Sequence, residues 1–178
     1  MKIKFAILSL ALIAAAVIVI AAPASDMVID VHYLTDQGIG KKIGTITAEQ
    51  TPHGTLFTPE LSGLSPGMHG FHLHEQGSCG PKEKDGRMVP GLAAGGHYDP
   101  EGTGSHQGPY GKGHKGDLPA LYADKSGKVT LPVLAPRIGL KDLKGRALII
   151  HAGGDNYSDE PSPLGGGGAR IACGMAGK

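Results

Sequence analysis

Short segments in which apolar and polar residues alternate run along most of the chain after residue 24. In residues 27–35, for example, the side chains of Ile29, Val31 and Tyr33 alternate with those of the residues between them. This two-residue period is typical of a β-strand, because successive side chains point to opposite faces. The same pattern predicts strands at residues 27–35, 41–50, 53–60, 68–74, 118–123, 128–135, 146–151 and 169–175. No segment after residue 24 keeps a 3.6-residue apolar period, so we expect an all-β domain, an antiparallel sandwich or barrel.

Two long stretches lack this alternation, at residues 75–116 and 153–168. Both are rich in glycine, of which the chain holds 30 residues. A connection this long without secondary structure is usually functional or disordered. We therefore look for chemistry in these two loops.

The first 24 residues have the pattern of a secretory signal peptide. Lys2 and Lys4 give a positive start, and residues 5–22 are uncharged and almost wholly apolar. Ala22-Pro23-Ala24 then has the small-x-small pattern of a signal-peptidase site. We expect cleavage after Ala24, which leaves a domain of residues 25–178. The alternative is an uncleaved anchor, since about 18 apolar residues approach the length that spans a membrane. Either way the sequence predicts export.

Export changes how the two cysteines and the charge are interpreted. Cys79 and Cys173 are the only cysteines, and a lone pair in an oxidising compartment usually forms a disulfide. Two buried free thiols are the alternative. Removing Lys2 and Lys4 lowers the formal net charge from +1 to about −1. Such a chain gives no reason to expect nucleic-acid binding or a polybasic membrane patch.

Histidines concentrate in and around the first loop. His72 and His74 are two apart on a predicted strand, so both imidazoles can face one metal ion, although they could also be surface residues. Residues 97–117 add three histidines and an aspartate at spacings that let a glycine-rich loop surround zinc, namely His97, His106, His114 and Asp117. A solvated loop rich in histidine is the alternative for that set. His151 ends an apolar strand, where a histidine alone is more often structural.

The number of these residues is itself informative. Six histidines and one aspartate are seven ligands, whereas two four-coordinate sites need eight bonds. The difference disappears if one imidazole binds a metal through each ring nitrogen. Two cations on one ring would favour its imidazolate form.

Five segments together resemble the copper–zinc superoxide dismutases, in their bacterial exported branch. They are GFHLHEQGSC, GGHYDP, HQGPYGKGHKGDLPAL, IIHAGGDNYSD and GGGGARIACG. The resemblance covers essentially the whole chain after the leader, in family order. It implies an eight-stranded Greek-key β-barrel with long metal-binding and electrostatic loops, and one copper and one zinc ion per chain.

The resemblance also implies a role for each site residue. The copper ligands would be His72, His74, His97 and His151. The zinc ligands would be His97, His106, His114 and Asp117, with His97 as the bridge. Cys79 and Cys173 would form the family's disulfide, Arg170 would lie beside copper, and Asp155 would link a copper ligand to a zinc ligand.

The implied reaction is the dismutation of superoxide to oxygen and hydrogen peroxide, which would protect the cell envelope. Copper would gain and lose one electron, and His97 would leave reduced copper and take up a proton. The second loop carries acidic residues but no lysine, so the cations that steer superoxide must lie elsewhere. Candidates are Lys82, Lys84 and Arg87, which could equally be ordinary solvated charges.

Other functions and states stay open at this point. A copper–zinc buffering protein could use the same ligands, but it would not require Arg170. A metallochaperone would normally carry a separate transfer module. The protein could be a monomer or a homodimer. His32 and His53 are expected to be exposed strand residues, and His69 to be structural.

Overall fold

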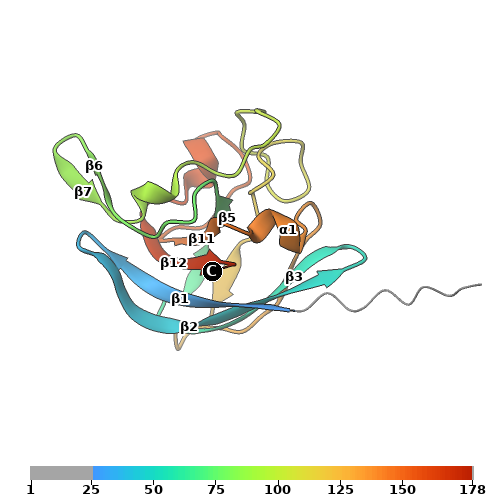
Figure 1. Ribbon diagram of the computed structural model, residues 1–178, viewed down its shortest axis with the longest axis horizontal. Helices are drawn as coiled ribbons and strands as arrows, with labels where there is room; N and C mark the ends of the chain where they lie inside the picture. The colour runs from blue at the N-terminus through green and yellow to red at the C-terminus, as the bar shows by residue number, and fades with distance from the viewer. Residues whose placement is uncertain (1–25, 178) are drawn as a thin grey trace, which may run out of the picture.

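The computed structural model describes residues 26–177, and the predicted leader of residues 1–24 lies outside this range. Antiparallel strands account for most of the regular structure (Figure 1). The strands are β1 (Met27–Thr35), β2 (Gly38–Thr51), β3 (Gly54–Ser62), β4 (Gly67–His69), β5 (Phe71–His74), β6 (Lys82–Lys84), β7 (Arg87–Val89), β8 (Leu121–Ala123), β9 (Lys128–Val129), β10 (Val133–Ala135), β11 (Arg146–His151) and β12 (Arg170–Ala176). The helical turns are η1 (Leu92–Ala94), α1 (Leu140–Leu143) and η2 (Pro163–Gly166).

The strands form a curled antiparallel sheet in the order β10-β3-β2-β1-β12-β11-β5, with β9 also pairing with β3. The strand pair β4–β8 continues the curl, because β4 and β5 are separated only by Gly70. β3 pairs with β9 and β10 rather than with β4, the next strand along the chain, and such a long return connection is typical of a Greek key. This arrangement confirms the predicted all-β, antiparallel barrel-like fold.

Two predicted strands are interrupted in the structure. The predicted strand 68–74 breaks at Gly70, whose N–H donates to the Gly153 carbonyl at 2.8 Å and whose carbonyl accepts from the His151 N–H at 2.8 Å. The predicted strand 128–135 breaks into β9 and β10 around Pro132, which has no N–H to donate to a sheet. Each predicted strand is therefore two short strands.

The prediction that residues 75–116 are wholly irregular is wrong. They contain an exposed hairpin, β6–β7, and the turn η1. Figure 1 shows this hairpin projecting away from the barrel. The connection 140–145 likewise contains the single helical turn α1.

The apolar core lies inside the curled sheet. Phe57 and Phe71 are fully buried and pack edge to face, with their ring centroids 5.5 Å apart. A second, smaller cluster surrounds the predicted disulfide, which joins Cys79 to Cys173 across 94 positions of sequence. This disulfide ties the start of the first loop to β12.

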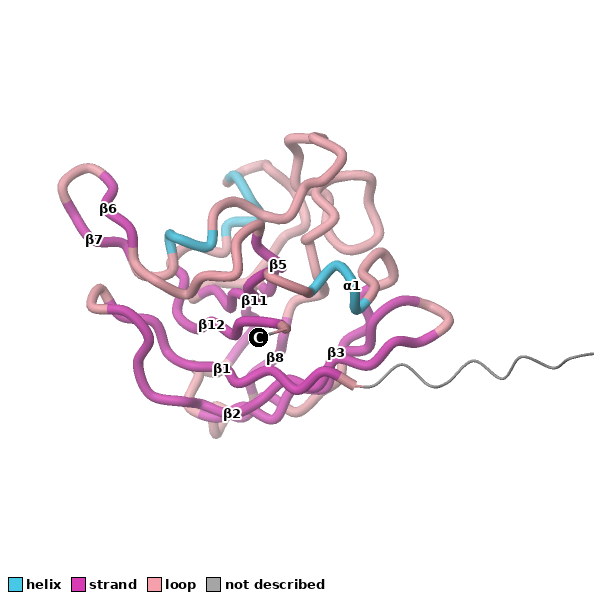
Figure 2. Tube along the Cα trace, viewed as in Figure 1, coloured by secondary structure: helices cyan, strands magenta, loops and turns pink. Residues whose placement is uncertain are grey.

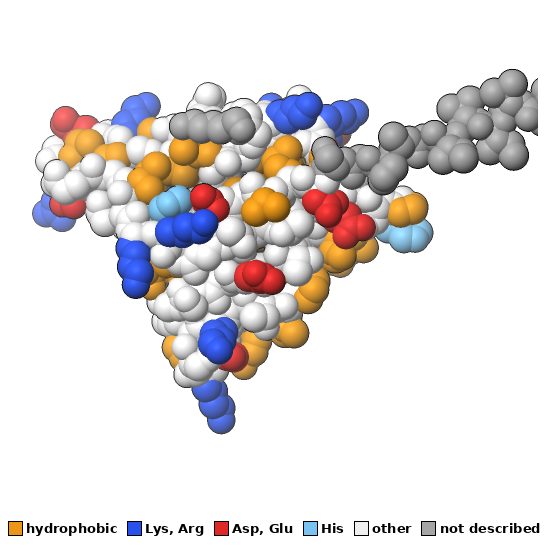
Figure 3. Space-filling view, turned by 60° about the horizontal axis from the view of Figure 1, so that its bottom comes forward, with side chains coloured by type: hydrophobic (Ala, Val, Ile, Leu, Met, Phe, Trp, Pro, Cys, Tyr) orange, Lys and Arg blue, Asp and Glu red, His pale blue; other side chains and the backbone are white. Residues whose placement is uncertain are grey.

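The long loops gather on the side of the barrel where β5 and β11 lie (Figure 2). On the face shown in Figure 3, basic and acidic side chains are interspersed rather than grouped by sign. Within residues 26–177 no helix has the length and apolar character needed to cross a membrane.

Candidate metal centre

Strand pairing brings together histidines that are far apart in the sequence. His72 and His74 lie on β5, which pairs with β11 so that Ile149 is opposite His72. His151 is the last residue of β11. The neighbours of the two histidines on β5, Phe71 and Leu73, belong to the apolar core. The two-residue period of β5 therefore directs its apolar side chains to the core and its imidazoles to the loops.

Both ends of the zinc-type loop, residues 97–117, attach to this same strand. The Leu73 carbonyl accepts from the Tyr98 N–H at 2.8 Å, and the Leu73 N–H donates to the Gly116 carbonyl at 2.9 Å. A Cβ at Gly116 would lie 2.2 Å from the Leu73 carbonyl oxygen, so this close approach requires glycine. As a result, single β-bridges place His97 opposite His74 and Asp117 opposite His72.

One group of buried imidazoles consists of His72, His74, His97 and His151. Each offers a ring nitrogen, and these four atoms lie within 4.8 Å of one another. The other nitrogen of His74 contacts the Gly95 carbonyl at 3.0 Å, and that of His151 contacts the Gly168 carbonyl at 3.1 Å.

The inward nitrogens of three of these rings have no hydrogen-bond partner among the described residues, which bears on whether the group can hold a metal ion. His72 Nδ1, His74 Nε2 and His151 Nε2 are buried without a hydrogen-bond partner in the described part of the chain. Buried polar atoms normally have a partner. Three converging lone pairs of this kind fit a bound metal ion.

The electrostatics of this group favour neutral rings. Burial lowers the pKa of His72 to about 3 and that of His151 to about 4. Burial also holds the pKa of His74 well below its ordinary value and lowers that of His97. A metal binds the neutral imidazole, so these rings need lose no proton before binding at neutral pH.

The second group consists of His97, His106, His114 and Asp117, all of them buried. Three ring nitrogens surround one carboxylate oxygen: Asp117 Oδ1 is 2.9 Å from His97 Nδ1, 2.9 Å from His106 Nδ1 and 3.4 Å from His114 Nδ1. Only His97 makes a hydrogen bond to this oxygen, and Nδ1 of His106 and of His114 have no partner in the described residues. Three nitrogens and one carboxylate oxygen are an acceptable ligand set for tetrahedral zinc.

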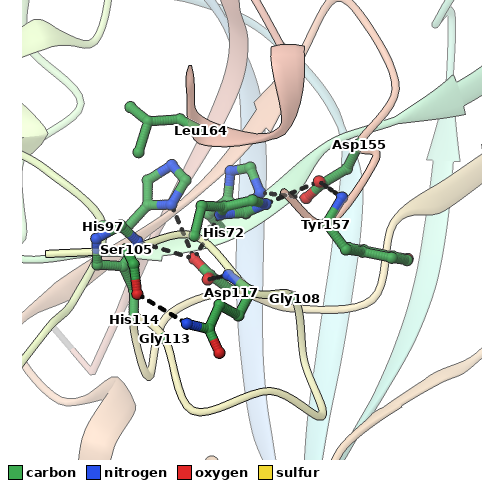
Figure 4. A network of polar contacts seen from close by, with 12 residues as sticks. His72, His97, Ser105, Gly108, Gly113, His114, Asp117, Asp155, Tyr157 and Leu164 are labelled. Carbon is green, nitrogen blue, oxygen red and sulfur yellow. Dashed lines mark hydrogen bonds and ion pairs between the residues drawn. The ribbon is translucent and has the colours of Figure 1, made fainter. Parts of the chain in front are cut away.

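Asp155 connects the two groups (Figure 4). Its Oδ2 is 2.8 Å from His72 Nε2 and its Oδ1 is 2.8 Å from His106 Nε2. Burial raises the pKa of Asp155, but the hydrogen bonds from His106 and His72 outweigh burial and hold this pKa well below the ordinary value. For His106, burial lowers the pKa, but the carboxylates of Asp117 and Asp155 outweigh burial and raise it to about 9. Asp155 therefore joins a residue of the first group to a residue of the second.

Arg170 lies beside the first group. It begins β12 and is paired with His151 across the sheet. Its guanidinium donates to the Gly91 carbonyl at 2.7 Å and to the Gly95 carbonyl at 2.8 Å. The same Gly95 carbonyl also contacts Nδ1 of His74. Burial lowers the pKa of Arg170, and an arginine nevertheless stays charged at neutral pH.

Some polar residues have positions that the sequence pattern did not indicate. Asp159, predicted only as a loop charge, accepts the backbone N–H groups of His106 at 2.8 Å and Leu164 at 3.0 Å. Gln107 donates its N–H to Asp117 Oδ2 at 3.1 Å. These contacts join segments distant in sequence or depend on turn geometry, so alternation along the chain carries no signal for them.

The remaining histidines lie outside both groups. His69 is buried, and its ring nitrogens contact the His151 carbonyl at 2.7 Å and the Ser65 carbonyl at 2.8 Å, which is a structural position. His53 is exposed and His32 is partly exposed. Three cations lie on the hairpin β6–β7, and within residues 26–177 none of them forms an ion pair: Lys82, Lys84 and Arg87.

Comparisons with known proteins agree with this geometry. The family profile described as copper/zinc superoxide dismutase (SODC) matches residues 42–176. The Cu-Zn superoxide dismutase of Photobacterium leiognathi is 60% identical over 143 residues, which are 80% of this chain and 83% of that protein.

Two solved structures are similar over their whole length. The Cu/Zn superoxide dismutase from Brucella abortus has a TM-score of 0.83 at 51% identity, and the similarity covers 85% of this chain and 99% of that chain. The monomeric copper, zinc superoxide dismutase from Salmonella enterica, solved in solution, has a TM-score of 0.78 at 52% identity, with coverage of 85% and 99%. The chain belongs to the copper/zinc superoxide dismutase family.

Proposed function

We propose that this enzyme converts superoxide to oxygen and hydrogen peroxide at a two-metal centre in which the imidazolate of His97 joins copper to zinc. Family membership makes the chain an oxidoreductase that acts on superoxide with copper and zinc as cofactors. The bridge and the assignment of each ligand go beyond the comparisons. They are supported by the geometry of the two buried groups.

The donor sets support one assignment of the two metals. The all-imidazole group would hold copper, through His72, His74, His97 and His151. The group with a carboxylate would hold zinc, through His97, His106, His114 and Asp117. Bound copper supplies the one-electron chemistry, which zinc lacks.

His97 is the only residue shared by these two groups. Its Nδ1 faces Asp117, which leaves Nε2 for the first group. We assign Nε2 as the atom that takes up a proton and passes it to the reduced substrate. His74 and His151 keep their orientation, because the outward nitrogen of each ring is bonded to a backbone carbonyl.

Arg170 is the residue that favours an enzymatic centre over a site that only stores metal. Two carbonyls hold its guanidinium in place beside the copper group, and a guanidinium has five N–H donors. Some donors therefore remain for a small anion such as superoxide, which the positive charge would attract. A protein that only stores copper and zinc has no use for such a group.

The test is to replace Arg170 with alanine in the metal-loaded protein. We expect the rate of superoxide removal to fall by about tenfold or more, the size of an electrostatic effect on association, while copper and zinc content stay unchanged. Lys125→Ala, in the exposed turn after β8, is the matched control and should keep the full rate. A fully loaded wild type without activity would instead favour the buffering protein.

We propose that the enzyme acts in the periplasm after cleavage behind Ala24, where it protects the cell envelope. The basis is the leader pattern of residues 1–24 and the disulfide, which suits an oxidising compartment. The mass of the protein in a periplasmic extract tests this, and an intact chain in the membrane fraction would contradict it. Sedimentation would decide between a monomer, as in the Salmonella enterica structure, and a homodimer.

A further inference from the structure

Arg137 lies outside both metal groups, yet its guanidinium makes four hydrogen bonds to the loop that carries the zinc-type ligands. Nε donates to the Pro109 carbonyl at 3.2 Å and Nη1 donates to the Gly113 carbonyl at 2.8 Å. Nη2 donates to the Gly108 carbonyl at 3.1 Å and to the His114 carbonyl at 2.5 Å. These contacts use four of the five N–H donors of an arginine.

The loop segment that Arg137 contacts has little else to order it. Residues 108–114 read GPYGKGH, and the aromatic side chain of Tyr110 is 76% exposed. Pro109 is the one apolar side chain of the segment that is buried, so the segment gains little from apolar burial. Gly108, Pro109 and Gly113 are buried, and within the described residues only Arg137 donates to their carbonyls. Buried carbonyls need such a donor.

Arg137 is itself attached firmly to the barrel. It follows β10 and Pro136. The ring of a proline fixes the backbone angle φ of that proline. The next residue, Ile138, is 2% exposed and belongs to the apolar core. The carbonyl of Ile138 accepts the hydroxyl of Thr55, on β3, at 2.8 Å. The guanidinium therefore links a rigid part of the barrel to a loop that lacks its own core.

We infer that Arg137 is a positioning residue for zinc, which holds His114 and the turn before it in the geometry that zinc requires. This inference rests on the assignment of His97, His106, His114 and Asp117 to zinc. The charge of Arg137 cannot be its contribution, because a positive charge near a cation site opposes cation binding. Its contribution must be the planar fork, which reaches several carbonyls at once and which lysine cannot reproduce.

The experiment compares Arg137→Lys and Arg137→Gln with the wild type as complete, disulfide-bonded proteins. Zinc affinity is measured by competition with a chromophoric chelator, and the absorption of Co(II) in the zinc position reports ligand geometry. We expect both variants to bind zinc 10–100-fold more weakly, the usual effect of losing a partner outside the ligand set, and to show altered Co(II) bands. Copper affinity, measured with the zinc position filled, should stay unchanged, because Arg137 has no contact with the copper group. A merely structural role would not separate the two metals in this way.

The control is Arg87→Gln, which removes the same charge from the exposed hairpin and should leave zinc affinity unchanged. Wild-type zinc affinity in Arg137→Lys would overturn the inference, because it would show that the fork is dispensable. Equal weakening of copper and zinc would also overturn it. If Arg137→Gln does not fold, Arg137→Lys carries the test, since it keeps the charge and an aliphatic stem. A wild type that binds no zinc would refute the proposed function instead, so the two failures are distinguishable.

Discussion

Replacing Asp155 with alanine should release zinc before copper. The carboxylate is completely buried and accepts one N–H from His72 and one from His106, each at 2.8 Å. It also accepts the backbone N–H of Tyr157 at 2.7 Å. Alanine has neither of the two acceptor oxygens. Both imidazoles therefore lose their partner.

The magnitude follows from these contacts. A hydrogen bond to a charged group contributes about 1.5–3 kcal/mol, so losing one corresponds to a roughly 10–100-fold loss of metal affinity. The loss should fall mainly on zinc, because His106 lies on a loop whereas His72 lies on β5, which is paired with β11. Strand pairing can keep His72 in place without Asp155. His106, by contrast, depends on polar contacts with other loop residues.

The assay measures zinc and copper content after dialysis against increasing chelator, together with the Cu(II) electron paramagnetic resonance spectrum. We expect zinc to be lost at 10–100-fold lower chelator strength than in the wild type and the Cu(II) spectrum to change once zinc has left. Glu160→Gln removes a carboxylate from the same loop at an exposed position and serves as the control. Zinc retention equal to the wild type, or loss of copper with zinc retained, would refute this reasoning.

Two further predictions concern the first loop. Reducing the disulfide between Cys79 and Cys173 should lower the free energy of unfolding by about 4–5 kcal/mol, as expected for a closed loop of about 95 residues. Urea unfolding with and without reductant measures this difference, and equal unfolding midpoints would contradict the prediction. Replacing the hairpin cations with glutamine should slow superoxide removal at low ionic strength but not at high salt. If the variant and the wild type have equal rates at low salt, the substrate is not steered by Lys82, Lys84 and Arg87.

Most of the strands, and the residue types that gather at the site, could be predicted from the sequence because both depend on local pattern. The two-residue period places His72 and His74 on one face of a strand wherever that strand lies in the fold. The number of histidines predicted a residue common to two groups, and His97 belongs to both groups in the structure. The break at Gly70 could not be predicted in this way, because its cause is a pair of backbone hydrogen bonds to Gly153 and His151, about 80 positions later in the sequence.

The partners that hold the ligands were largely invisible to the sequence pattern. Arg137 reads as an isolated cation after a strand, and Asp159 reads as a loop charge. Each acts through backbone groups of a distant segment, and backbone groups have no sequence signature. Asp155 was identified only by resemblance to the family. Residues that support a site across long loops are therefore the hardest part of it to infer from a single chain.

The two halves of the centre obtain their order from different sources, and this difference has a chemical consequence. The copper-type ligands His72, His74 and His151 lie on paired strands, whose geometry is fixed by the core. The zinc-type ligands lie on a loop held by polar contacts from Asp155 and Arg137. Damage to those contacts should therefore appear first as loss of zinc. His97 belongs to both groups, so a loosened zinc loop would reach the redox metal through this one imidazole.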